Sequence, residues 1–175
     1  MITPDIWVQV PGWIAAALVV ASFQAATLPR LIGLQMAGYC FLGVQFVLLD
    51  AWTGAVMTGV GIVRLMLALA AAHRPELRRI YPVFLPIIWA TCAATWVGWG
   101  SLLPAIGYTL GTLAVIQERM RRTRWLFLAA HPFWLAYNVI VGSSGGVAME
   151  LCNIASSTTA ILRHRRADNL QRAPS

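Results

Sequence analysis

Long apolar stretches alternate with short polar or glycine-rich breaks along the whole chain. Seven such stretches cover residues 7–23, 31–49, 54–72, 80–96, 102–116, 125–141 and 145–162. About 20 apolar residues in a helix, with about 17 as the lower limit, cross the hydrocarbon core of a bilayer. Because backbone groups in lipid must be hydrogen-bonded within the segment, each stretch is expected to be an α-helix. The pattern predicts seven transmembrane helices, of which the fifth is the shortest.

The amino-acid composition also indicates a membrane protein. Hydrophobic residues make up 59% of the chain and charged residues only 11%. A soluble domain carries about 25% charged residues, so this chain lacks the charge needed to cover its surface in water. It is also too apolar to be disordered. We therefore expect an all-α integral membrane protein with the lipid bilayer as its main partner.

The arginines indicate the orientation. All 13 basic residues are arginine, and twelve lie in the breaks after the first, third and fifth stretches or after the seventh. The thirteenth, Arg64, lies inside the third stretch, and the remaining segments carry only Asp5 and Asp50. By the positive-inside rule, the N-terminus is outside and the C-terminus cytoplasmic in a bacterial inner membrane. The same rule explains the net charge of +7 without a nucleic-acid partner.

The first apolar stretch differs from the core of a signal peptide. A signal peptide needs a basic region before its apolar core, and only Asp5 precedes the first stretch. We therefore expect the first helix to be retained.

Residue types needed for enzymatic or cofactor chemistry are missing or scattered. The chain has no lysine, which excludes a retinal Schiff base. Cys40, Cys92 and Cys152 lie in apolar stretches without CxxC or Cys/His spacing, so no disulfide framework or zinc site is expected. His131 is the single histidine within a stretch and cannot ligate a haem on both faces. No catalytic triad, H-E-x-x-H or paired-acid motif occurs, so we expect a protein that is not an enzyme and binds no cofactor or metal.

A weak internal repeat divides the chain. Shifts of 93 and 92 residues align six pairs: Pro11 with Pro104, Gln24 with Gln117, Gln45 with Asn138, Gly54 with Gly146, Met57 with Met149 and Ile62 with Ile154. The matches predict two related three-helix bundles, 1–79 and 100–166, joined by a linker helix within 80–99 and followed by an unstructured polar tail, 167–175. This 3+1+3 arrangement would make the bundles parallel repeats, as in some transporters. The alternative is a compositional echo among helices rich in Ala, Gly and Leu.

Three segments carry a family resemblance. They are LQMAGYCFLGVQFVLLDAWTGAVMTGVGIVRLML (34–67), LPAIGYTLGTLAVIQ (103–117) and FWLAYNVIVGSSGGVAMEL (133–151). They resemble the bacterial inner-membrane family Imp-YgjV, most specifically in the N-x-x-x-G-S-x-G-G-x-x-x-E run and in Arg64. The resemblance covers nearly the whole chain. It implies membership of the group with SWEET, PQ-loop and PnuC-type transporters, and therefore 3+1+3 helices. Gln45 replaces a histidine common in that family, and the PQ dipeptide is absent, so no substrate carries over.

Arg64 and Glu150 are the ionisable side chains expected inside the bilayer. Burying such a group costs at least about 2.5–3.5 kcal/mol on insertion scales, so both should face protein or a watery cavity. They lie about 15 Å and 7 Å below the outer ends of their helices, at about 1.5 Å per residue. They could therefore form a structural ion pair between the third and seventh helices, or a substrate or proton site in a central cavity. The sequence leaves both interpretations open.

Four further side chains are candidates for a solute pathway. Gln45 and Asn138 occupy matching places in the two bundles, where amides often only hydrogen-bond a neighbouring helix. Alternatively they line a pocket with Trp134 and Tyr137 that binds a small polar solute. The GSSGG run at 142–146 predicts a tight turn.

The sequence favours one function and leaves a second as the alternative. One is a transporter or facilitator for a small polar solute, in which these side chains should line a water-filled cavity. The other is a membrane scaffold or regulator, in which they should be paired in dry helix contacts. The sequence leaves the solute, any coupling ion and the formation of homo-oligomers open.

Overall fold

The computed structural model describes residues 6–117 and 120–172, with side chains except those of 120–121 and 163–172. This part of the chain contains helices and turns, and the expected all-α fold with seven α-helices is confirmed. The helices are α1 (Ile6–Ser22), α2 (Leu28–Leu48), α3 (Trp52–His73), η1 (Pro75–Val83), α4 (Phe84–Ala94), η2 (Trp99–Ser101), α5 (Leu102–Ile116), α6 (Met120–Val141) and α7 (Ser144–Arg172). The two labelled η are short 3-10 helices.

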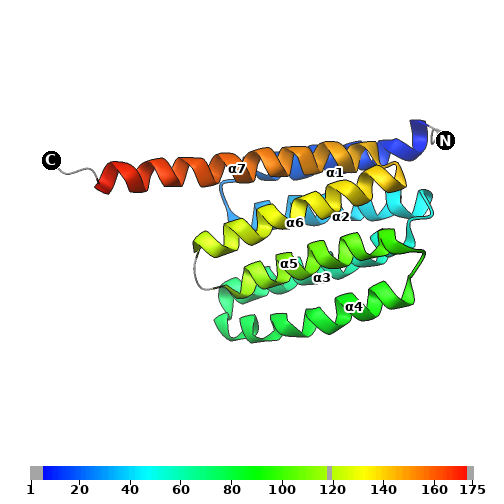
Figure 1. Cartoon of the computed structure of the whole chain (residues 1–175), viewed down its shortest axis with the longest axis horizontal. Helices are drawn as coiled ribbons and strands as arrows, with labels where there is room; N and C mark the ends of the chain where they lie inside the picture. The colour runs from blue at the N-terminus through cyan, green and yellow to red at the C-terminus, as the bar shows by residue number, and fades with distance from the viewer. Residues whose placement is uncertain (1–5, 118–119, 173–175) are drawn as a thin grey trace.

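The α-helices form two layers (Figure 1). One layer contains α1, α2 and α3, and the other contains α7, α6 and α5. Helix α1 packs on α7 at one edge, while α4 packs on both α3 and α5 at the other. Odd-numbered helices run in one direction, so the turns after α2, α4 and α6 share one end, which we name the Asp50 end. The breaks after α1, α3 and α5 share the other, which we name the arginine end.

The fourth and last helices differ from the sequence prediction. A single helix was expected over residues 80–96, but only Phe84–Ala94 is α-helical and the 3-10 helix η1 precedes it. Pro82 lacks an N–H and its ring would clash with the carbonyl four residues back, which disfavours α-helix through this segment. The tail was expected to be unstructured from residue 167, yet α7 continues to Arg172. The rest of that tail, 173–175, lies outside the described residues.

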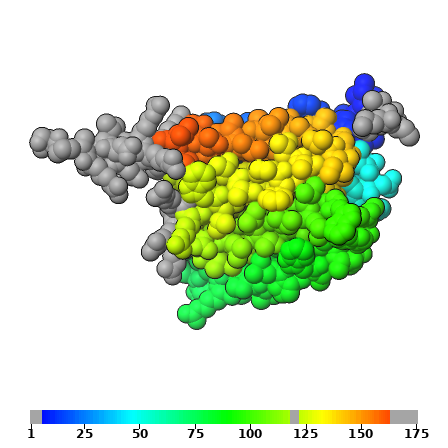
Figure 2. Space-filling model, in the orientation of Figure 1, coloured from blue at the N-terminus to red at the C-terminus, as the bar shows by residue number. Residues whose placement is uncertain are grey.

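Figure 2 shows one face of the bundle, on which the orange, yellow and green segments of α7, α6 and α5 lie side by side. Many large apolar side chains of the described residues are exposed. Val139 and Ile140 on α6 are 61% and 65% exposed, and Val63 and Met66 on α3 are also more than half exposed. Large exposed apolar side chains on several helices fit contact with lipid or another protein. In the described residues, three helical segments are long and apolar enough to span a membrane: Leu28–Leu48, Trp52–His73 and Trp99–Ile116. Helix α1 is a shorter apolar helix of 17 residues.

Exposed tryptophans gather at the Asp50 end. Trp7 lies at the start of α1, Trp52 at the start of α3 and Trp99 at the start of η2. Each is at least half exposed. Tryptophan is enriched where a membrane meets water, so these side chains fit an interfacial belt.

Candidate functional site

A cavity lies between the two layers, and we name it the chamber. Its volume is about 80 Å³. A single water needs about 10–15 Å³, so the chamber holds several waters or a small solute. Polar side chains on its walls come from α2, α3, α5, α6 and α7, among them Tyr39, Thr58, Arg64, Tyr108, His131, Glu150 and Asn153.

The chamber leads into a larger hollow, which we name the vestibule. The vestibule has a volume of about 480 Å³ and shares Arg64, His131 and Asn153 with the chamber. Its other walls include Phe23 at the end of α1 and Arg124 near the start of α6, both at the arginine end. The chamber is therefore accessible from the arginine end of the bundle.

Arg64 lies near the middle of α3 and is held in one orientation by α5. Its Nη1 donates hydrogen bonds to Oγ1 of Thr112 at 3.0 Å and to the carbonyl oxygen of Tyr108 at 3.3 Å. Its Cζ lies 4.8 Å from the centroid of the Tyr108 ring, in a cation–π contact. Gly111 makes room for the guanidinium, because a Cβ there would lie 3.3 Å from Nη1. These contacts orient the guanidinium, and no carboxylate of the described residues forms an ion pair with it.

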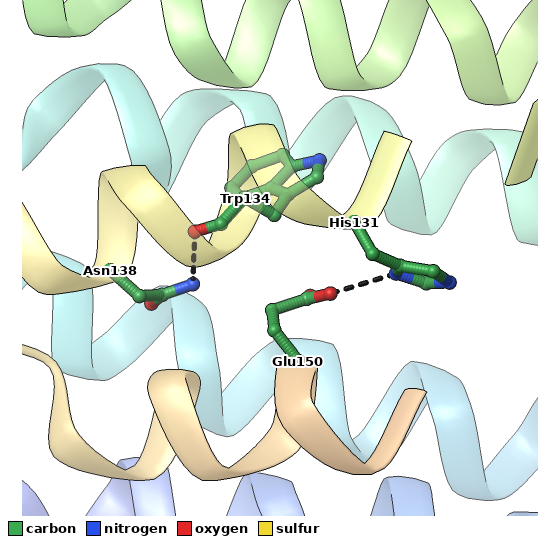
Figure 3. A network of polar contacts seen from close by, with 4 residues as sticks. All are labelled: His131, Trp134, Asn138 and Glu150. Atoms are coloured by element: carbon green, nitrogen blue, oxygen red, sulfur yellow. Dashed lines mark hydrogen bonds and ion pairs between the residues drawn. The ribbon is translucent and has the colours of Figure 1, made fainter. Parts of the chain in front are cut away.

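Glu150 is paired with His131 (Figure 3). Oε2 of this carboxylate lies 2.8 Å from Nδ1 of His131, and the glutamate is 5% exposed. The contact is a hydrogen bond when the imidazole is neutral and an ion pair when it is protonated. The two residues belong to α6 and α7, which pack against each other as an antiparallel pair.

The ion pair proposed between Arg64 and Glu150 does not form in this structure. Among the described residues, Glu150 contacts His131, and no salt bridge joins it to Arg64. The reason is the order of the helices: α3 packs mainly on α2, α4 and α5, whereas α7 packs on α1 and α6. Both charged residues line the chamber, but on different walls.

Gln45 and Asn138 were predicted either to hydrogen-bond a neighbouring helix or to line a pocket, and they are not among the residues that line the chamber but lie toward the Asp50 end. Both are fully buried, three residues before the ends of α2 and α6. Nε2 of Gln45 donates to Oε1 of Gln9 at 2.9 Å, and Ser143 Oγ donates to Oε1 of Gln45 at 2.7 Å. Nδ2 of Asn138 donates to the carbonyl oxygen of Trp134 at 2.8 Å, while its Oδ1 has no hydrogen-bond partner (Figure 3). Gln45 therefore links α2 to α1 and to the turn before α7, whereas the hydrogen bond of Asn138 stays within α6.

Three aromatic rings separate the chamber from the Asp50 end, and we name them the aromatic barrier: Phe46, Trp134 and Tyr137. The ring centroids of Trp134 and Tyr137 lie 6.0 Å apart, and those of Phe46 and Tyr137 lie 5.6 Å apart, both edge to face. Oη of Tyr137 accepts a hydrogen bond of 2.8 Å from the backbone N–H of Gly54 on α3. Trp134 lines the chamber, whereas Tyr137 lines a separate pocket of about 360 Å³ that includes Asp50.

Sequence reasoning missed two participants. His131 was considered only as a haem ligand, although the short turn at 142–143 makes α6 and α7 neighbours and brings His131 and Glu150 to similar depths. Gln9 is a polar residue within the apolar first stretch. Its presence there was the feature of the sequence that could have indicated a buried polar contact. The turn itself is confirmed: Gly142 has a φ of 75°, a conformation glycine adopts without strain. Ser143 within it also bonds Gln45.

The fold and the site define an α-helical membrane protein with a polar chamber inside its bundle. In the described part of the chain, no group of three His, Cys, Asp or Glu side chains could hold a metal ion. The chain matches the Imp-YgjV family of bacterial inner membrane proteins over residues 6–168 and belongs to that family. No curated protein and no solved structure matches it.

Proposed function

We propose that the protein is a multi-pass transporter or facilitator for a small polar solute in the bacterial inner membrane. In this proposal all seven α-helices cross the bilayer in the 3+1+3 arrangement of the group with SWEET, PQ-loop and PnuC-type transporters (the MtN3-like group). The observation that carries the proposal is the chamber, which holds Arg64 and the Glu150–His131 pair inside the bundle and shares wall residues with the vestibule at the arginine end. Charged groups inside a membrane bundle are expensive and typically mark solute or ion pathways.

The second supporting feature is the closure toward the Asp50 end. The aromatic barrier separates the chamber from the pocket that contains Asp50 and Tyr137. Trp134 lines the chamber and Tyr137 lines the pocket with Asp50, and the two rings contact each other, so the aromatic barrier lies between the two compartments. A shift of the aromatic barrier joins the chamber to the Asp50 end, and alternation between the two openings moves a solute across.

Cysteine accessibility tests the chamber directly. We expect Asn153→Cys, in a background without Cys40, Cys92 and Cys152, to react with a membrane-impermeant thiol reagent from the arginine end only. The matched control is Val139→Cys on the lipid-facing surface of α6, which should resist the same charged reagent from both sides. Inside-out and right-side-out vesicles distinguish the sides. Protection of position 153 from both sides would show that the chamber is dry and would contradict transport.

A membrane scaffold is the second candidate function. Its specific support is that Gln45 and Asn138 are fully buried in helix contacts rather than in the chamber. A scaffold predicts that solutes leave the thiol reactivity of Asn153→Cys unchanged. A transporter predicts that its solute slows that reaction, because the solute occupies the same space. A metabolite-uptake comparison in vesicles with and without the protein identifies the solute.

Reporter fusions test the orientation. We expect a reporter fused after residue 166 to be active in the cytoplasm, and one fused before residue 6 to be active outside. The physical reason is the concentration of arginines at the arginine end, which the positive-inside rule assigns to the cytoplasm. Activity of the first fusion outside the cytoplasm would reverse the assignment of both ends.

A further inference from the structure

We propose, building on the proposed function, that the solute is a small carboxylate bound by Arg64, and that a proton on the Glu150–His131 pair accompanies it. The chamber thus contains an anion site and a proton site on different walls.

The anion site follows from the contacts of Arg64. In the described residues, Nη1 is hydrogen-bonded, whereas Nη2 and Nε have no acceptor and no carboxylate pairs with the guanidinium. An unpaired cation in a partly buried chamber is unfavourable, and binding an anion relieves that cost. The planar guanidinium binds a carboxylate through two parallel hydrogen bonds.

Chamber size restricts the ligand. An apolar cavity of about 150 Å³ holds one benzene molecule, and the chamber is about 80 Å³. A ligand of about two to four carbon atoms therefore fits, with its short apolar part against Leu42 and Met149 and its carboxylate on Arg64.

Charge balance supplies the reason for the proton. With Arg64 charged, Glu150 ionised and His131 neutral, the chamber has no net charge. A bound carboxylate makes it negative by one unit, and one proton on the Glu150–His131 pair restores neutrality. Because uncompensated charge in a low-dielectric site is costly, carboxylate and proton binding favour each other. The titratable or charged side chains facing the chamber and vestibule, by element, are Tyr39 (α2), Arg64 (α3), Tyr81 (η1), Tyr108 (α5), Arg124 and His131 (α6), and Glu150 (α7).

Calorimetric titration of the purified full-length protein in detergent with acetate tests the anion site. We expect acetate to bind and acetamide, its neutral counterpart of the same shape, not to bind. Arg64→Gln should weaken acetate binding by about 10- to 100-fold, because a hydrogen-bonded charge pair is lost. Elution as a single species in size-exclusion chromatography shows that the variant is folded. The comparison of acetate with acetamide uses the unmutated protein and does not depend on the variant. Inorganic phosphate and chloride serve as the other anions.

Titration in buffers of different ionisation enthalpy tests the proton site. We expect acetate binding to weaken as pH rises, with proton uptake that approaches about one per acetate. Glu150→Gln keeps a hydrogen-bond acceptor for His131 and removes one negative charge. Acetate on Arg64 then leaves the chamber neutral without an added proton, so both the uptake and the pH dependence should disappear. Glu76→Gln removes an exposed carboxylate outside the chamber and should change neither.

The outcomes separate this inference from the proposed function. Binding of phosphate or acetamide in place of acetate overturns the carboxylate assignment and leaves a transporter of another solute. Acetate binding without proton uptake overturns the coupling. If no small solute binds and position 153 is also protected from thiol reagents, the proposed function fails as well.

Discussion

Replacing Gly145 with leucine should strongly destabilise the protein. Gly145 near the start of α7 touches the backbone of Gly12 on α1, and a Cβ at this position would collide with that backbone. Backbone cannot rotate away as a side chain can, so α7 must separate from α1. Overpacking costs typically about 1–3 kcal/mol, and this site should lie at the upper end. Thermal unfolding in detergent, followed by circular dichroism, measures the decrease in stability.

Gly59→Leu is the matched control for that experiment. Gly59 is also a helical glycine, but nothing lies within 4 Å of a Cβ built there. Since both substitutions add the same side chain to a helix, the difference between them isolates the α1–α7 contact. Equal unfolding temperatures for the two variants would mean that α1 and α7 do not meet at Gly12.

Replacing Tyr137 with alanine should open the chamber toward the Asp50 end. The ring contributes to the aromatic barrier, and its hydroxyl accepts the hydrogen bond from Gly54. Without both, Asn153→Cys should react with the impermeant thiol reagent from both sides of the membrane. Uptake should become a leak that no longer accumulates solute.

Tyr137→Phe separates the two contributions of this residue. This substitution keeps the ring and removes the hydroxyl, so the closed barrier loses one hydrogen bond, which contributes about 1 kcal/mol to its stability. That free energy shifts the equilibrium between closed and open barrier by about fivefold. Reactivity at position 153 from the Asp50 end should therefore rise to a level between wild type and Tyr137→Ala. Unchanged reactivity in both variants would show that Tyr137 does not close the chamber.

The helices could be predicted from sequence because a membrane imposes a simple rule. Apolar runs must be helical in lipid, and glycine, proline or charge marks their ends. The fifth helix, Leu102–Ile116, has the predicted bounds. The fourth does not, because the local effect of Pro82 is stronger than the apolar pattern around it.

The site was only partly predictable. Arg64 and Glu150 were identified because ionisable groups inside a bilayer are rare, and both line the chamber. Their partners depend on which helices are neighbours, and hydropathy does not contain that information. For Gln45 and Asn138 the sequence left a helix contact and a pocket lining open, because hydropathy does not say which side chains face a cavity; both are buried outside the lining of the chamber.

The short α4 has a consequence for the surrounding lipid. From Ile80 to Ala94, four residues of 3-10 helix at about 2.0 Å each and eleven of α-helix at about 1.5 Å span about 24 Å. The hydrocarbon core of a typical bilayer is about 30 Å thick. In a seven-crossing arrangement, this edge of the protein therefore has a negative hydrophobic mismatch. Acyl chains beside α4 should be compressed, and thinner bilayers should favour the folded protein.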